Sequence, residues 1–158
     1  MSDESEFTNP QEPLIAEPVE APDPAEAISS EERTMALLAH LSIFLNLITG
    51  FLGAGAALLI YLLYKDKSRY VAYQSLQALF FQLIFFFGGS LLVGFFWLVT
   101  GLLSLVLVGL VLIPFALILS LLPIGCLAYA IYAAVETYHG KDFKYWLVGD
   151  WTRSTLTN

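Results

Sequence analysis

Hydrophobic residues fill this chain from about residue 35 onward, in two long blocks that one short charged segment separates. The first block, 35–64, has thirty residues without a charged side chain, apart from the titratable His40. The second block, 71–135, is also free of acidic and basic residues, and KDKSR at 65–69 lies between the two. Apolar runs of 18 or more residues are typical of helices that cross a membrane.

The first block is too long for one upright membrane helix. Thirty residues would form a helix of about 45 Å, against roughly 30 Å of hydrocarbon. Its middle, 46–55, contains an asparagine and three glycines, which weaken a helix. We therefore expect two helices, about 30–48 and 52–66, folded as a tight hairpin, with Ser29 and Glu32 as a capping box at the start. One long, tilted and kinked helix is the alternative.

The second block predicts two long helices, at about 70–99 and 103–138. Residues 102–122 contain sixteen Leu, Val, Ile or Phe side chains, which favour insertion into a bilayer by roughly 5–10 kcal/mol. A further break at Leu122-Pro123 would add a crossing. The fold class predicted is therefore all-α, a polytopic helical membrane protein with about four transmembrane or membrane-embedded helices; three crossings are the alternative.

The two ends of the chain differ from the blocks. Residues 1–29 are rich in proline and glutamate, and ten of the fourteen acidic residues lie within 1–34. Such a composition buries too little apolar area to fold, so we expect a disordered acidic tail. Residues 139–158 mix Trp, Tyr and Lys, which is typical of the headgroup level, and predict an interfacial tail. The domain expected between them is 30–138.

Charge adds to this picture. Only 13% of the residues are charged, whereas a soluble domain has about 25%. Bases gather in the 65–69 loop and in the C-terminal tail, and cytoplasmic loops of membrane proteins are enriched in bases. We expect both segments on the cytoplasmic side, with an even number of crossings between them. The acidic tail is cytoplasmic if 30–66 is a spanning hairpin, and outside if it is one crossing.

Several short motifs occur in an order that resembles a known family. They are ERTMALLAHLS at 32–42, YKDKS at 64–68, QALFFQ at 77–82 and HGKDFKY at 139–145. Together they resemble the bacterial membrane family domain of unknown function 4870, which is similar to the Tic20-like group related to a chloroplast inner-envelope import subunit. The resemblance covers about 31–150. It implies a multi-pass protein of the bacterial plasma (inner) membrane, and no particular activity.

Polar side chains inside the apolar blocks are the candidate functional residues. His40 and Asn46 lie in the first predicted helix, and Gln74, Gln77 and Gln82 fall on one broad face of the third. Polar groups in lipid usually face protein or a wet cavity. They are expected to join helices by hydrogen bonds; the functional alternative is a polar path or a partner contact.

Nothing in the chain indicates catalysis. No nucleophile–base set, phosphate-binding loop or paired carboxylate is present, and one cysteine, Cys126, gives no thiolate cage. We expect no enzyme activity, no cofactor, no metal site and no nucleic-acid binding. The first hypothesis is a small membrane protein that acts through helix–helix and partner-protein contacts, with the bilayer, a second copy or another membrane protein as partner. The second is an oligomeric channel or transporter whose path the five polar residues line.

Overall fold

The computed structural model describes residues 28–157, and the regular structure of this part of the chain is entirely helical. The predicted all-α fold class is confirmed. The predicted disordered tail, 1–29, lies outside the described residues except for its last two positions.

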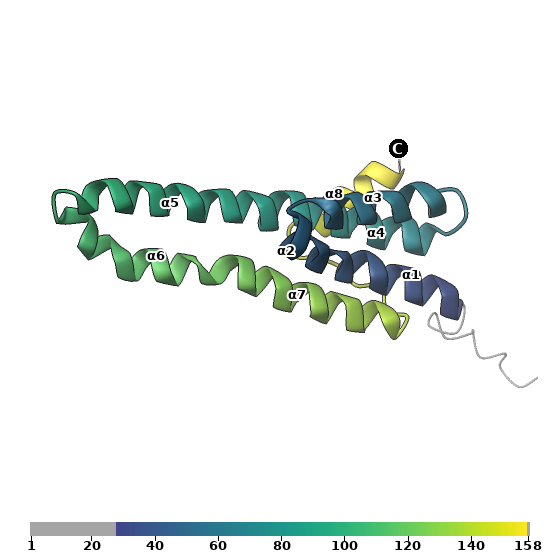
Figure 1. The fold of residues 1–158 in the computed structure, drawn as a ribbon. Coiled ribbons are helices and arrows are strands. Elements are labelled where there is room, and N and C mark those ends of the chain that lie inside the picture. The colour runs from purple at the N-terminus through teal and green to yellow at the C-terminus, as the bar shows by residue number, and fades with distance from the viewer. Residues whose placement is uncertain (1–27, 158) are drawn as a thin grey trace, which may run out of the picture.

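The first apolar block folds as a short helical hairpin (Figure 1). α1 (Ser30–Leu41) passes through a 3-10 turn (Ser42–Phe44) into α2 (Leu45–Thr49), and α3 (Leu52–Tyr64) folds back. Gly50 ends α2 with a φ of +84°, a left-handed conformation that glycine adopts without steric cost. This position, within the predicted helix-weakening stretch, reverses the chain.

The start of α1 is fixed by its own side chains. The Ser29 hydroxyl accepts a hydrogen bond from the Glu32 amide at 3.2 Å, and the Ser29 amide donates to the Glu32 carboxylate at 2.8 Å. This confirms the capping box.

The second apolar block forms a much longer hairpin. Its outgoing leg is one continuous helix of 36 residues, made of α4 (Arg69–Phe81), a π-helical stretch (Gln82–Phe87) and α5 (Gly88–Ser104). The returning leg consists of a 3-10 turn (Val108–Leu112), α6 (Ile113–Leu119) and α7 (Leu121–Tyr138). The two legs lie antiparallel along the length of the molecule (Figure 1).

The reversal between these legs comes later than predicted. The expected helix end at 99 is wrong, because the helix continues through Thr100 and Gly101 to Ser104 and the chain turns at 105–107. A single glycine costs a helix only about 1 kcal/mol, which an apolar run of helix formers offsets. Leu107 makes the turn in a left-handed conformation, with a φ of +65°. The turn residues 105–107 are all Leu or Val, with Ser104 before them and Gly109 two positions after Leu107.

A packed head forms at one end of the long hairpin. α1 packs against α4 and α7, and α3 packs against α4. After a loop at 139–147, α8 (Val148–Thr157) lies on α4. The sequence did not predict α8, nor that Tyr145 and Val148 of the C-terminal segment would be buried in the core.

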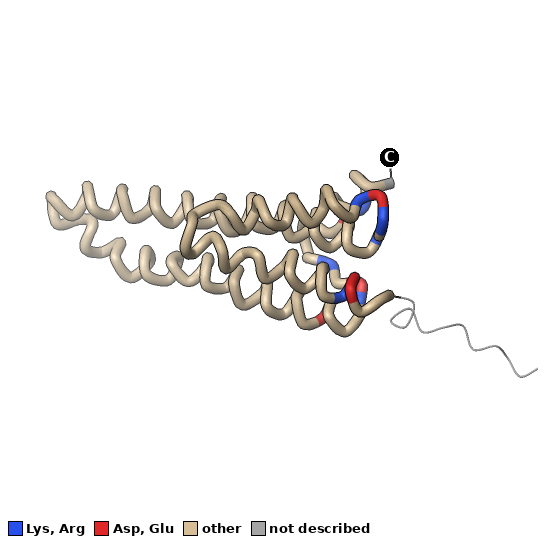
Figure 2. Tube along the Cα trace, turned by 45° about the vertical axis from the view of Figure 1, so that its right-hand side comes forward, with Lys and Arg blue, Asp and Glu red and all other residues tan. Residues whose placement is uncertain are grey.

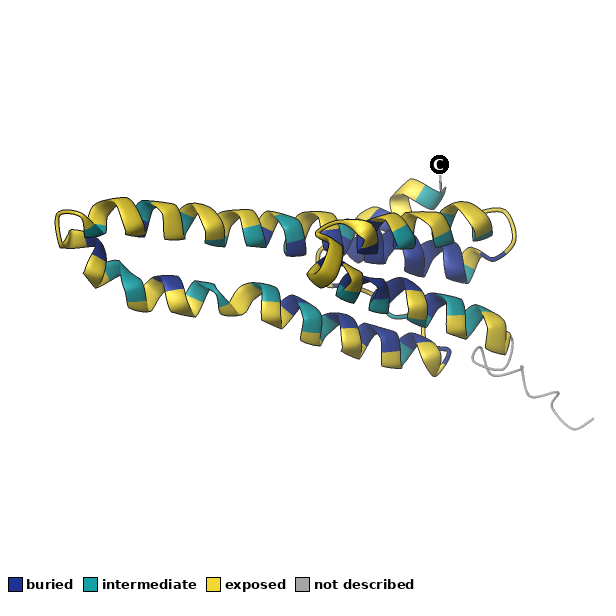
Figure 3. Ribbon diagram, viewed as in Figure 1, coloured by how far each residue is buried: buried dark blue, intermediate teal, exposed yellow. Residues whose placement is uncertain are grey.

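The other end of the hairpin extends beyond the head with little covering it. All the charged side chains that the structure describes lie at the head end, and none lies on α5, α6 or the turn (Figure 2). The apolar surface of this extension is exposed (Figure 3), and Leu105 at the turn is 83% exposed. The molecule is thus polarised along its axis, from a charged head to an apolar tip.

Two described helices have the length and apolar composition needed to cross a membrane, Arg69–Ser104 and Val108–Tyr138. α3 is equally apolar but has only 13 residues. Of the four helices expected to be membrane-embedded, two therefore meet the criterion for a span by length and composition.

Candidate functional site

The five polar residues singled out in the sequence are all buried in the head. His40, Asn46, Gln74, Gln77 and Gln82 have exposed fractions between 0% and 5%. The structure divides them into two hydrogen-bonded groups, one around His40 and one around Asn46. In each group they contact one another and the main chain.

The His40 cluster comprises His40, Gln74, Gln77 and Tyr145, with the main chain of Phe143. The His40 Nε2 lies 3.1 Å from the Gln74 Oε1, and the His40 Nδ1 lies 3.2 Å from the Tyr145 hydroxyl. Because the amide oxygen of Gln74 only accepts, Nε2 is the donor, and in the neutral imidazole Nδ1 then accepts from the Tyr145 hydroxyl. One tautomer of the imidazole thus satisfies both bonds and links α1 to α4 and to the C-terminal loop.

Gln77 is the centre of this cluster. Its Nε2 donates to the Phe143 carbonyl at 3.0 Å and to the Gln74 Oε1 at 3.2 Å. Its Oε1 accepts from the Tyr145 amide at 2.9 Å and from the Tyr73 hydroxyl at 3.0 Å. One side chain of α4 therefore holds two main-chain groups of a loop that lies almost seventy residues later in the chain.

Tyr145 is the residue of this site that the sequence did not predict. It is 1% exposed, and its ring stacks on Phe81 with centroids 4.1 Å apart. Tyr129 and Phe143 contact the same ring edge-on, each at 5.0 Å. The only signal for it in the sequence is the aromatic content of the C-terminal segment, which predicts a preference for the membrane surface.

The Asn46 cluster comprises Ser42, Asn46, Gln82 and the main chain of Gly53. Asn46 donates from Nδ2 to the Gln82 Oε1 at 2.9 Å and accepts from the Gly53 amide at 2.8 Å. Gln82 in turn donates to the Ser42 hydroxyl at 3.0 Å. These bonds join both legs of the short hairpin to the start of the π-helical stretch.

The two clusters leave their polar groups satisfied. Among the described residues, Thr100 has the one buried side-chain oxygen without a hydrogen-bond partner, and it lies outside both clusters. Buried amides that are fully paired rigidify a core and specify one packing. The geometry favours the interpretation that these residues join helices.

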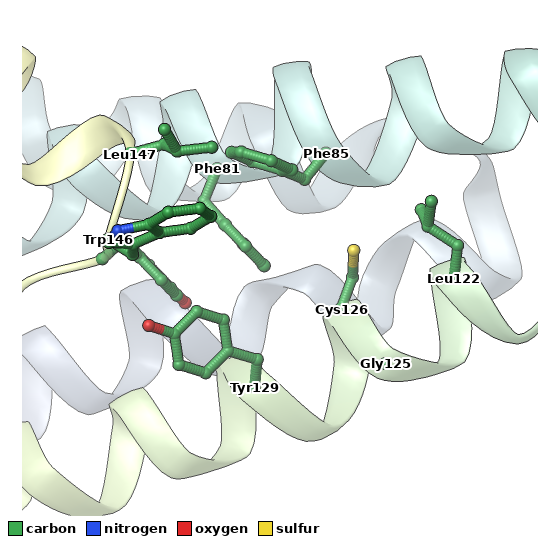
Figure 4. Close-up of a pocket in the computed structure, with 9 residues that line it drawn as sticks. Phe81, Phe85, Leu122, Gly125, Cys126, Tyr129, Trp146 and Leu147 are labelled. Carbon is green, nitrogen blue, oxygen red and sulfur yellow. The ribbon is translucent and has the colours of Figure 1, made fainter.

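An apolar cavity of about 200 Å³ lies beside the His40 cluster, between the long helix and α7 (Figure 4). Trp146 and Leu147 of the C-terminal loop stand at one end of it and Leu122 at the other, with the Cys126 thiol on its wall. Hydrocarbon side chains dominate this lining. The cavity offers apolar contact rather than acid–base chemistry.

The remaining titratable groups sit at the charged end of the head. Lys141 pairs with Glu136 at 2.8 Å, and the hydrogen bond and charge of this carboxylate raise the pKa of Lys141. The His139 Nδ1 lies within hydrogen-bond distance of the Val135 carbonyl oxygen, at 2.7 Å. Within the described residues, no group of three or more His, Cys, Asp or Glu side chains is placed to hold a metal ion.

A comparison with models of known protein families gives a match over most of the chain. The model of the MamF/MmsF family, described as the magnetosome magnetite crystal formation protein family, matches residues 31–152. No curated protein and no solved structure matches the chain.

This match overturns the resemblance to domain of unknown function 4870 and the Tic20-like group. The motifs that carried it include His40, Ser42, Gln77 and Gln82, which build the two buried clusters. Short motifs of this kind supply polar residues for helix packing. Such residues can recur in helical proteins of different families, so the motifs alone do not identify a family.

Proposed function

Because this chain belongs to the MamF/MmsF family of magnetosome magnetite crystal formation proteins, we propose that it is a small magnetosome membrane protein that takes part in forming magnetite crystals. The family match is the observation that carries the proposal. It extends over residues 31–152, from the first turn of α1 into α8, so it includes the head, the long hairpin and the C-terminal loop.

The long hairpin supports a membrane location. Its outgoing leg alone is about 54 Å long at 1.5 Å per residue, against roughly 30 Å of hydrocarbon. It carries no charged residue after Arg69, and its surface beyond the head is apolar. In this proposal both legs cross the bilayer of the magnetosome, rather than the plasma membrane that the resemblance implied.

The charged head supports an orientation. The 65–69 loop and the C-terminal segment, which together carry six of the seven bases, lie at the same end of the molecule (Figure 2). Two crossings between them would place both on one side, and the excess of bases favours the cytoplasmic side.

The polar clusters support a non-enzymatic role. Their amides and imidazole are used in holding α1, α4 and the C-terminal loop together, so they offer neither an exposed base nor an open path. The channel alternative gains no support from this geometry. The protein would act through contacts made by its charged head and its exposed apolar helices with other components of the magnetosome.

Deleting the coding sequence in a magnetosome-forming bacterium tests this function. We expect electron microscopy to show smaller or fewer magnetite crystals in membrane vesicles that still form, because the proposed role lies in crystal formation. Complementation with the intact chain should restore the crystals. Crystals of normal size and number in the deletion strain would contradict the proposal.

A further inference from the structure

A groove with basic walls lies at the charged end of the head, on the side of α8. It consists of two cavities, about 470 and 450 Å³ in volume, which share Arg69 and Leu156. Lys65 lines one of them, and Arg153 and Tyr73 line the other. We call this feature, between the start of α4 and the end of α8, the basic groove.

The charges in the basic groove are unbalanced. The structure pairs its one acidic residue, Asp142, with Arg153, whose guanidinium also lies 4.9 Å from the centre of the Tyr73 ring. The hydrogen bond to Tyr73 raises the pKa of Arg153. Lys65 and Arg69 are exposed, and neither forms an ion pair within residues 28–157. Their two positive charges are available to an anion.

The surroundings of the basic groove are apolar on one side. Lys65 directly follows α3, whose surface includes Leu59, Leu62 and Leu63, each exposed by more than half. Leu156 lines both cavities. A free phosphate ion would use the bases alone, whereas a phospholipid would use the bases and the leucines together.

We propose that the basic groove binds the phosphate headgroup of an anionic phospholipid, with the acyl chains lying along the exposed leucines of α3. Lys65 and Arg69 contact the phosphate, and Arg153, held by Asp142, forms the far wall. The proposal rests on the membrane location given above and adds a specific lipid site to it. Such a site would fix the depth and tilt of the head at the bilayer surface.

Native mass spectrometry of the full chain in mild detergent tests the site. We expect one dioleoyl phosphatidylglycerol to bind about tenfold better than dioleoyl phosphatidylcholine, because bases near an anionic headgroup each add a severalfold preference. The double variant Lys65→Gln with Arg69→Gln should reduce this preference to about twofold.

The matched control is Lys67→Gln with Lys141→Gln, which removes the same charge outside the groove. Lys67 lies over the Tyr64 ring and Lys141 pairs with Glu136, and neither lines the two cavities. The control should keep the full preference. Equal binding of the two lipids, an equal loss in the control, or displacement of the lipid by an equal concentration of inorganic phosphate would overturn the proposal.

Carbonate extraction of the same variants keeps this test separate from the membrane proposal. Both double variants should remain in the membrane, since the hairpin is unchanged. If carbonate removes the unmodified chain from the membrane, the proposed membrane location is wrong. If the chain stays in the membrane but shows no preference between the two lipids, only the proposed lipid site is wrong.

Discussion

Replacing Gln77 by leucine is expected to release the C-terminal loop from α4 and to lower the free energy of unfolding by about 3 kcal/mol. The buried Tyr145 amide donates to Gln77, and leucine offers no acceptor in its place. A buried donor left without a partner costs about 1–3 kcal/mol, and the bonds to Gln74 and Tyr73 are lost as well. In detergent, the melting temperature should fall by roughly 10 °C.

Limited trypsin digestion separates this local release from a general loss of stability. Lys141 and Lys144 lie within the loop that Gln77 holds, so cleavage after them should become faster in the Gln77→Leu variant. The matched control is Gln82→Leu, which makes the same change on the same long helix but breaks the bonds to Asn46 and Ser42. Equal acceleration of this cleavage in both variants would contradict the role given to Gln77.

Replacing Gly53 by alanine is expected to separate α3 from the turn that follows α1, at a cost of about 1–3 kcal/mol. A Cβ atom at this position would lie 2.2 Å from the Ser42 carbonyl oxygen and 2.7 Å from the Asn46 Oδ1. The first of these is main chain and cannot rotate away. The Gly53 amide would also move away from Asn46, to which it donates at 2.8 Å.

Gly55, two positions later on α3, provides the control. A Cβ there meets nothing within 4 Å, so alanine should only improve helix propensity and raise stability by up to about 1 kcal/mol. Thermal unfolding in the same detergent should therefore move in opposite directions for Gly53→Ala and Gly55→Ala. Two shifts of the same sign would contradict the close approach at Gly53.

The sequence predicted those parts of the fold that depend on local pattern. The capping box at Ser29 and Glu32 and the all-helical class follow from neighbouring residues and from apolar block length. The turn at Leu107 was not predicted, because the left-handed residue is a leucine and not a glycine, and the nearby Ser104 and Gly109 are also compatible with a continuous helix.

The sequence predicted the polar side chains of the candidate site, but not the loop to which they form hydrogen bonds. Helical periodicity placed Gln74, Gln77 and Gln82 on one face, and the structure buries all three. The partner is the loop around Tyr145, which binds mainly through its main chain, and main-chain groups leave no mark in the sequence. The neighbouring Lys144 and Trp146 are typical of a membrane surface, so nothing in the sequence indicates that Tyr145 between them is buried.

We expect the part of the long hairpin beyond the head to lie in hydrocarbon, while the charged end of the head stays in water. Cysteine labelling tests it most directly, with single cysteines at Lys67 and Leu98 in a Cys126→Ala background and a membrane-impermeant maleimide. Leu98 is 59% exposed in the structure, so protein alone does not shield it. We expect Lys67→Cys to label in intact vesicles that expose the cytoplasmic face, and Leu98→Cys to stay unlabelled until detergent is added. Rapid labelling of Leu98→Cys in intact vesicles would contradict the claim.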